Sequence, residues 1–287
     1  GAEIFFGGMA DHWNVPACDY DPTGNYPINP KIDNPHSNNH VSWQRCDRIT
    51  ARKPSTDLST EATIDFIENQ SDDTPFFAYV SFMAPHDPRS MPEDFLQMYD
   101  PQKIEIPENF VPEHPFDNGW MKGRDELLAE FPRTKSEVQR HIAEYYAMIS
   151  HLDAAVGRVM NKLRERGILD DTIILFAGDN GLAIGQHGLM GKQNVYDHSV
   201  HVPLILAGPN IPSGERRKAL TYLLDIFPTL CDLIGIQYPK TVEGKSLIPH
   251  LERPAEQIRE YLHFAYEGLQ RGIRDQQYKL IEYVVGD

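Results

Sequence analysis

The fold class is decided by residues 172–181, TIILFAGDNG, in which six uncharged residues run directly into a short polar turn. The apolar part predicts a buried β-strand. A long helical pattern (134–163) comes just before it, and a second apolar run, residues 202–207 (VPLILA), follows it. Helices that alternate with short, continuously apolar strands are typical of a parallel sheet covered by helices. We therefore expect an α/β fold, a three-layer α/β/α sandwich with a mostly parallel central sheet.

The long helix has recognisable ends. Thr134 and Glu137 have the spacing of a capping box, and Gly167 stands where a C-terminal glycine ends a helix. Between them, apolar residues recur three and four positions apart and form one stripe, namely Val138, Ile142, Tyr145, Ile149, Leu152, Val156, Val159 and Leu163. An apolar strand follows immediately, which favours a helix of an α/β domain over a coiled coil.

The remaining segments complete the expected domain. Helices are predicted at 59–70 and 225–235, a strand at 75–82 (PFFAYVSF), and long loop regions at 10–57 and 84–133. After residue 251, two strand-like runs, 261–266 and 278–285, indicate an antiparallel unit. We predict a main domain over residues 1–251 and the beginning of a C-terminal subdomain over 252–287.

Composition excludes several classes of protein. The 287 residues include 27 Lys and Arg against 42 Asp and Glu, a formal charge of −15, and no clustered basic surface of the kind that binds nucleic acid. No apolar run approaches the ~20 residues of a membrane span. Cys18, Cys46 and Cys231 are too few and too widely spaced for a disulfide scaffold, and Cys231 is expected in the core.

Two predicted strands end in residues with useful chemistry. Asp179 and Asn180 follow the first, and their oxygen atoms suit Ca²⁺ or Mg²⁺, although an ordinary Asp-Asn-Gly turn has the same sequence. His86 follows the strand at 75–82, between Pro85 and Pro88. A histidine held there can donate to an anion or a leaving group, or can be a structural loop residue.

A glycine-rich segment, residues 185–192 (GQHGLMGK), contains the third candidate group. Lys192 can reach an oxyanion as a point charge, or can be a surface lysine on a loop. The segment is not a phosphate-binding P-loop, because the spacing differs by one residue and Gln193 replaces the required Ser or Thr.

Three blocks of sequence resemble the type I sulfatase family of the alkaline-phosphatase superfamily. They are residues 178–214, which begin GDNGLAIGQHGLMGK, the segment PFFAYVSFMAPHDPR, and LLDIFPTLCDLIG with the following VEGKSLIPHL. The resemblance implies a Ca²⁺-dependent sulfuric ester hydrolase. It implies that Asp179 and Asn180 are calcium ligands, that Lys192 and His86 contact the sulfate group, and that His187 lies near the scissile ester.

The family's nucleophile is a formylglycine made from Cys or Ser in a C/S-x-P-S/A-R motif. None of the cysteines or serines of this chain is followed by that pattern. We expect the motif upstream of residue 1, and we expect the 287-residue chain by itself to be inactive.

The substrate predicted from the loops is a sulfated carbohydrate. Trp13, His12 and Arg89 are the proposed substrate contacts, because aromatic rings stack on sugars and His and Arg meet hydroxyl or anionic groups. A phosphate or phosphonate monoester hydrolase of the same superfamily and a non-catalytic carbohydrate-binding relative are the alternatives. Such enzymes are usually exported, so we expect a periplasmic or extracellular location; the oligomeric state is not predicted.

Overall fold

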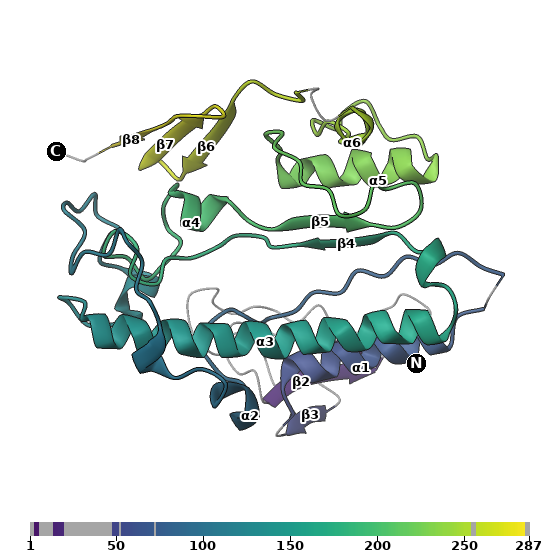
Figure 1. Cartoon of the computed structure of the whole chain (residues 1–287), viewed down its shortest axis with the longest axis horizontal. Helices are drawn as coiled ribbons and strands as arrows, with labels where there is room; N and C mark the ends of the chain where they lie inside the picture. Colours follow the sequence, from purple (N-terminus) through teal and green to yellow (C-terminus); the bar gives the residue numbers. More distant parts are fainter. Residues whose placement is uncertain are drawn as a thin grey trace. The chain divides into compact units, whose positions relative to one another are not determined.

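The computed structural model describes residues 3–5, 14–19, 48–51, 53–71, 73–253 and 257–284 (Figure 1). It divides the chain into two compact units. The first comprises residues 1–105 and 135–170, and the second comprises residues 106–134 and 171–287. This division does not follow the boundary predicted at residue 251, and that boundary stays a prediction.

The first unit is built around one long helix, α3 (Lys135–Glu165). Helix α1 (Ser55–Glu68), the short α2 (Glu93–Leu96) and the 3-10 helix η2 (Pro101–Lys103) pack along it. An antiparallel sheet of β1 (Glu3–Phe5), β2 (Asn14–Asp19) and β3 (Arg48–Ala51) completes the unit. The loop region predicted at 10–57 therefore contains two strands and the beginning of α1.

Helix α3 largely agrees with its predicted pattern. Val138, Ile142 and Leu152 are buried, whereas Ile149 is 40% exposed. The buried face also takes in Met148 and His151, because α1 and α2 cover a side of the helix that is offset from the predicted stripe. The backbone at Gly167 is left-handed, with φ +70°, as expected after the end of a helix.

Residues 75–82 do not form a strand, and that prediction is wrong. A strand is stabilised by backbone hydrogen bonds to a neighbour, and no described residue forms a ladder with this segment. Its aromatic side chains remain open to solvent in their unit, Phe77 at 78% and Tyr79 at 84%.

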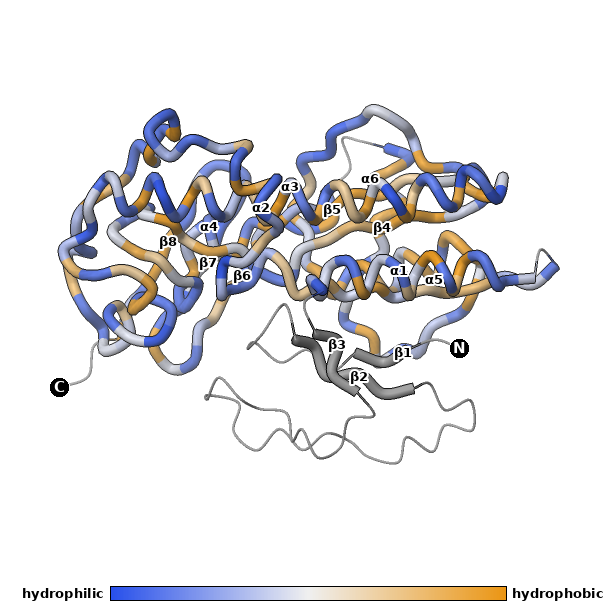
Figure 2. Tube along the Cα trace, turned by 90° about the horizontal axis from the view of Figure 1, so that it is seen from below, coloured by the Kyte–Doolittle hydropathy of each residue, from blue (hydrophilic) through white to orange (hydrophobic). Residues whose placement is uncertain are grey.

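The second unit contains the two strands that surround the predicted polar turn. Strands β4 (Ile174–Ala177) and β5 (Leu204–Ala207) pair with each other, and Figure 2 shows hydrophobic residues along both. The pairing is antiparallel, whereas the sequence predicts a mostly parallel sheet. A parallel pair needs a long crossover, usually a helix. Residues 178–203 contain only the four-residue α4 (Asp197–Val200), and the chain returns directly.

The rest of the second unit follows β5. It comprises η5 (Leu223–Asp225), α5 (Ile226–Ile234), α6 (Ile248–Glu252) and an antiparallel sheet of β6 (Leu262–Tyr266), β7 (Gln270–Arg274) and β8 (Lys279–Tyr283). The predicted helix at 225–235 is confirmed, with Gly235 left-handed at its end. The predicted antiparallel strands after residue 251 are also confirmed, with β7 between them. The 3-10 helices η3 (Arg124–Leu128) and η4 (Leu169–Asp171) lie earlier in the chain.

Candidate functional site

The turn after β4 is fixed at both ends and presents two polar side chains between them. The Gly178 N–H donates to the Pro203 carbonyl over 3.2 Å, and the Gly181 N–H donates to the Ser199 carbonyl over 2.9 Å. A Cβ atom on Gly181 would lie 2.1 Å from a backbone oxygen, so only glycine fits there. Asp179 and Asn180 stand between these anchors with exposed side chains.

Asp179 and Asn180 have the right chemistry for part of a calcium site. One Asp179 carboxylate oxygen accepts the Asn180 N–H at 2.8 Å, and the Asn180 amide nitrogen donates to the Gly181 carbonyl, so that the amide oxygen has no partner among the described residues. Asp179 forms no ion pair with a described residue. Within the described part of the chain, no group of three or more His, Cys, Asp or Glu could hold a metal. Carboxylate and amide oxygens are hard donors, and Ca²⁺ takes six to eight such oxygens, so this pair could be only part of a calcium site.

The glycine-rich loop leads from this turn to Lys192. Its two sides are joined by hydrogen bonds from the Ala183 N–H to the Gly191 carbonyl, 2.9 Å, and from the Gly185 N–H to the Leu189 carbonyl, 2.8 Å. Lys192 follows directly, is partly exposed, and makes no hydrogen bond or ion pair with any residue that the structure describes. The loop thus brings an uncompensated cation to the unit that holds Asp179 and Asn180.

His187 lies at the tip of the same loop and is held on two sides. The Asn109 amide nitrogen lies 3.0 Å from Nε2, and the ring stacks on Tyr196 with 4.3 Å between centroids. Because an amide NH₂ group donates, Nε2 accepts and the ring proton of a neutral imidazole is on Nδ1. Burial, helped by the nearby His114, lowers the pKa of His187. At neutral pH, His187 is thus an uncharged hydrogen-bond donor.

His86 and Arg89 belong to the other unit. His86 Nδ1 donates to the Asp87 carbonyl at 2.8 Å, which leaves Nε2 available to a ligand. The Arg89 side chain is 5% exposed; it pairs with the Asp87 carboxylate at 3.4 Å and contacts His141. Burial lowers the pKa of Arg89. An enclosed guanidinium does not favour direct contact with a large substrate, and the role of Arg89 stays a prediction. Trp13 and His12 lie outside the described residues.

The structure also reveals residues that no sequence pattern indicated. Glu126 and Arg133 form a buried ion pair beneath the glycine-rich loop, with 3.1 Å between Arg133 Nη2 and a Glu126 carboxylate oxygen. His198 lies near His187, and its Nε2 is buried without a hydrogen-bond partner among the described residues. Arg133 lies 55 residues before Gly188 and Glu126 lies 64 residues before Met190, so no local motif could have identified this pair.

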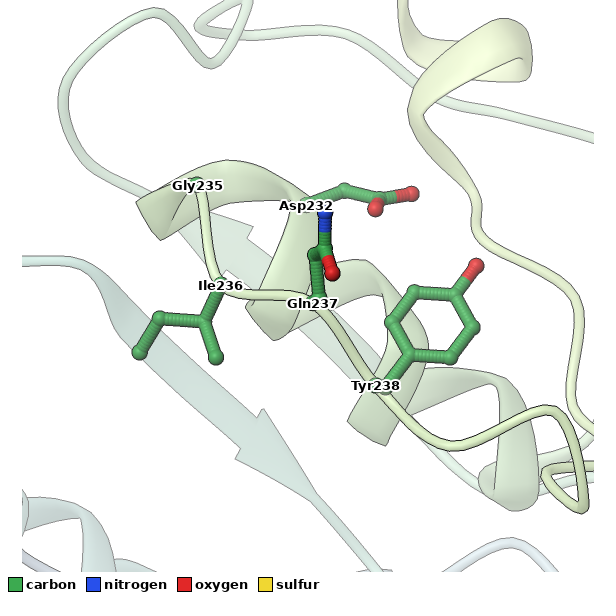
Figure 3. A pocket seen from close by; sticks show the side chains of 5 residues that line it. All are labelled: Asp232, Gly235, Ile236, Gln237 and Tyr238. Carbon is green, nitrogen blue, oxygen red and sulfur yellow. The ribbon is translucent and has the colours of Figure 1, made fainter.

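A shallow pocket of about 380 Å³ lies at the C-terminal end of α5. It is lined by Asp232, Gly235, Ile236, Gln237 and Tyr238, as Figure 3 shows. None of the predicted site residues lines it, so the pocket does not mark the chemistry considered above.

Comparison with known proteins shows the family of this chain. The family model "Sulfatase" matches residues 5–236. An arylsulfatase of Clostridium perfringens is 32% identical, over 72% of this chain and 44% of the relative. An N-acetylglucosamine-6-O-sulfatase of Bacteroides thetaiotaomicron is 26% identical, over 84% of this chain and 56% of the relative.

Solved structures agree as well. One determined with its substrate D-glucosamine-2-N,6-O-disulfate matches with a TM-score of 0.72 at 22% identity, covering 98% of this chain and 66% of that one. Phosphonate monoester hydrolases are also among the solved structures that match.

No helix in the described ranges combines the length and hydropathy needed to cross a bilayer. The chain spans about half the length of the curated relatives it matches. The predicted α/β fold of the alkaline-phosphatase type is thereby confirmed, and the chain belongs to the sulfatase family.

Proposed function

We propose that the full-length gene product hydrolyses sulfate esters and that this chain contributes the part of the site that binds the sulfate group. The observation that carries the proposal is the arrangement of residues 179–192. Asp179 and Asn180 stand at one end of a hydrogen-bonded segment, and Lys192, which pairs with no residue in the described part of the chain, stands at the other. A carboxylate that can bind a hard cation, together with an ammonium group that can donate hydrogen bonds, is suited to bind an oxyanion such as a sulfate ester.

The residues of this chain act by holding charge in place. Lys192 donates hydrogen bonds to a sulfate oxygen and opposes the negative charge that develops as the ester bond breaks. His86 helps to hold the transferring group or assists the leaving oxygen through its Nε2 atom. His187 donates from Nδ1 beside the ester. Asp179 and Asn180 would hold Ca²⁺, which would supply positive charge at the sulfate group, and a formylglycine from outside these 287 residues would supply the nucleophile.

The proposed substrate class is a sulfated carbohydrate. The N-acetylglucosamine-6-O-sulfatase that this chain resembles supports it, as do the aromatic residues of the 10–57 segment. The matching phosphonate monoester hydrolases support a second candidate, the hydrolysis of phosphonate monoesters. The Asp179–Asn180 pair favours sulfate, because transition metals with several His ligands serve the phosphate enzymes.

The test compares kcat/KM of the full-length gene product on a sulfated oligosaccharide, an aryl sulfate and a phosphonate monoester. We expect the sulfated oligosaccharide to be turned over best and Trp13→Ala to lower its kcat/KM selectively. A preference for the aryl sulfate, unchanged in Trp13→Ala and Arg89→Ala, contradicts the carbohydrate proposal. Fastest turnover of the phosphonate contradicts sulfatase activity itself.

A further inference from the structure

Glu126 and Arg133 form a buried ion pair within the second unit. Both residues are 2% exposed. Burying two charges costs desolvation free energy that their attraction offsets only when further hydrogen bonds complete the site. Here the further hydrogen bonds run to backbone groups of the glycine-rich loop, so the pair orients that loop.

Glu126 binds the backbone immediately before Lys192. Its carboxylate oxygens accept the Met190 N–H at 2.7 Å and the Gly191 N–H at 2.9 Å. Burial raises the pKa of Glu126, while these two N–H groups and Arg133 oppose that rise by favouring the charged form. The two bonds fix the orientation of successive peptide groups, and so fix the direction in which the chain enters Lys192.

Arg133 extends the same contact to the other side of the loop. Its guanidinium donates to the Glu126 carbonyl at 2.6 Å and to the Gly188 carbonyl at 3.4 Å, and it lies 3.8 Å from the centre of the Phe131 ring. The pair therefore holds the loop at Gly188 and at Gly191.

The backbone immediately after Lys192 is also held. The Gln193 carbonyl accepts from the Gln270 amide nitrogen at 3.1 Å, and the Gln193 amide nitrogen donates to Asp125 at 2.9 Å. A Cβ atom on Gly191 would lie 2.8 Å from a Glu126 carboxylate oxygen. Lys192 is thus fixed through its backbone on both sides, while its side chain has no polar partner among the described residues.

We infer that Glu126 is a positioning residue for Lys192, fixing the peptide groups that aim its ammonium group, with Arg133 holding Glu126 in place. The inference rests on the proposed function, in which Lys192 meets the sulfate group. Misplacing a reacting or binding group by ~1 Å can lower a rate about 100-fold. Loss of the contact between Glu126 and the backbone before Lys192 should therefore lower the rate of turnover measurably.

A double-mutant cycle on the full-length gene product tests the inference. The variants are Glu126→Gln, Lys192→Ala and the double variant, and kcat/KM is measured on the best sulfate ester. If Glu126 acts through Lys192, Glu126→Gln lowers kcat/KM about 10- to 100-fold in the wild type and has almost no further effect in Lys192→Ala. Equal losses in both backgrounds indicate a purely structural role and overturn the inference. Glu130→Gln is the matched control, because Glu130 is an exposed glutamate of the same segment.

Failure of the inference can be distinguished from failure of the proposed function. Wild-type kinetics of Lys192→Ala overturn the sulfate contact and the inference with it. An impaired Lys192→Ala beside an unaffected Glu126→Gln overturns only the inference. Should Glu126→Gln fail to fold, Gly191→Ala displaces the same backbone with both charges retained. We expect the same non-additivity with Lys192→Ala, and wild-type kcat/KM of Gly191→Ala overturns the inference.

Discussion

Two single residues, Asp179 and Lys192, carry opposite charges that no described neighbour neutralises. Uncompensated groups on a backbone held by hydrogen bonds are suited to bind ligands, because little reorganisation is needed when the ligand arrives. Their proposed roles differ, since Asp179 would offer oxygen to a cation and Lys192 would offer N–H donors to an anion. The two assignments are therefore separable by mutation.

We expect Asp179→Ala to weaken calcium binding and activity together in the full-length gene product, because a hard-cation site loses an anionic ligand. Lys192→Ala should lower kcat by about 100- to 1,000-fold, the usual effect of removing one electrostatic stabiliser, and leave calcium affinity nearly unchanged. Calcium titration calorimetry and steady-state kinetics measure the two effects. Lys122→Ala, at an exposed lysine of the same unit, is the control and should behave as wild type.

His198 is a second residue whose environment leads to a measurable prediction. Burial, with His187 and Lys279 nearby, lowers its pKa from 6.5 to about 3. Between pH 6.5 and about pH 3, the unfolded chain takes up a proton at His198 and the folded chain does not. The free energy of unfolding therefore falls as the pH drops through this window, by at most ~1.4 kcal/mol per pH unit.

The variant His198→Gln cannot titrate and should lose this part of the pH dependence. Urea unfolding at pH 7 and pH 5 measures it, and the wild type should lose up to about 2 kcal/mol more than His198→Gln between these values. An identical pH dependence in both proteins would show that the pKa of His198 is the same in the folded and the unfolded chain, and would contradict the prediction.

At the scale of elements, the beginning of α5 is tied to distant segments by one carboxylate. Asp225 is fully buried and accepts the Tyr222 N–H and the Lys245 N–H, each at 2.8 Å. Both of its oxygens also accept from the Arg259 guanidinium. One side chain thereby joins the helix to a loop and to the segment that leads into β6.

Asp225→Ala should destabilise the protein by about 3–5 kcal/mol, because it leaves the Arg259 charge without its partner and the Tyr222 and Lys245 N–H groups without their acceptor. Urea unfolding measures the change. Asp232→Ala replaces an exposed aspartate of the same helix and should stay within about 0.5 kcal/mol of the wild type. Similar small effects in both variants would contradict a joining role for Asp225.

At the scale of the whole molecule, the chain contains no C/S-x-P-S/A-R sequence. The purified 287-residue chain should not turn over a chromogenic aryl sulfate, with or without added Ca²⁺, whereas the full-length gene product should. Multiple turnover by the chain alone, dependent on metal, would show that another of its groups serves as nucleophile.

The sequence by itself determined the family, the helices α3 and α5, and the polar turn after β4. These are local features, because each depends on residues that are close together in the sequence. They are periodic apolar residues, glycines with a left-handed backbone, and polar residues in consecutive positions. For the same reason Asp179, Asn180 and Lys192 could be selected as candidates before their surroundings were known.

Only the tertiary structure decided how these pieces pair. Strand direction depends on the path between β4 and β5, and the apolar segment 75–82 forms no strand without a partner ladder. The contact of Glu126 with Gly191 spans 65 residues, and the lowered pKa of His198 arises from the groups that enclose it. Such features depend on contacts between residues distant along the chain, because burial and hydrogen bonding are set by neighbours in space.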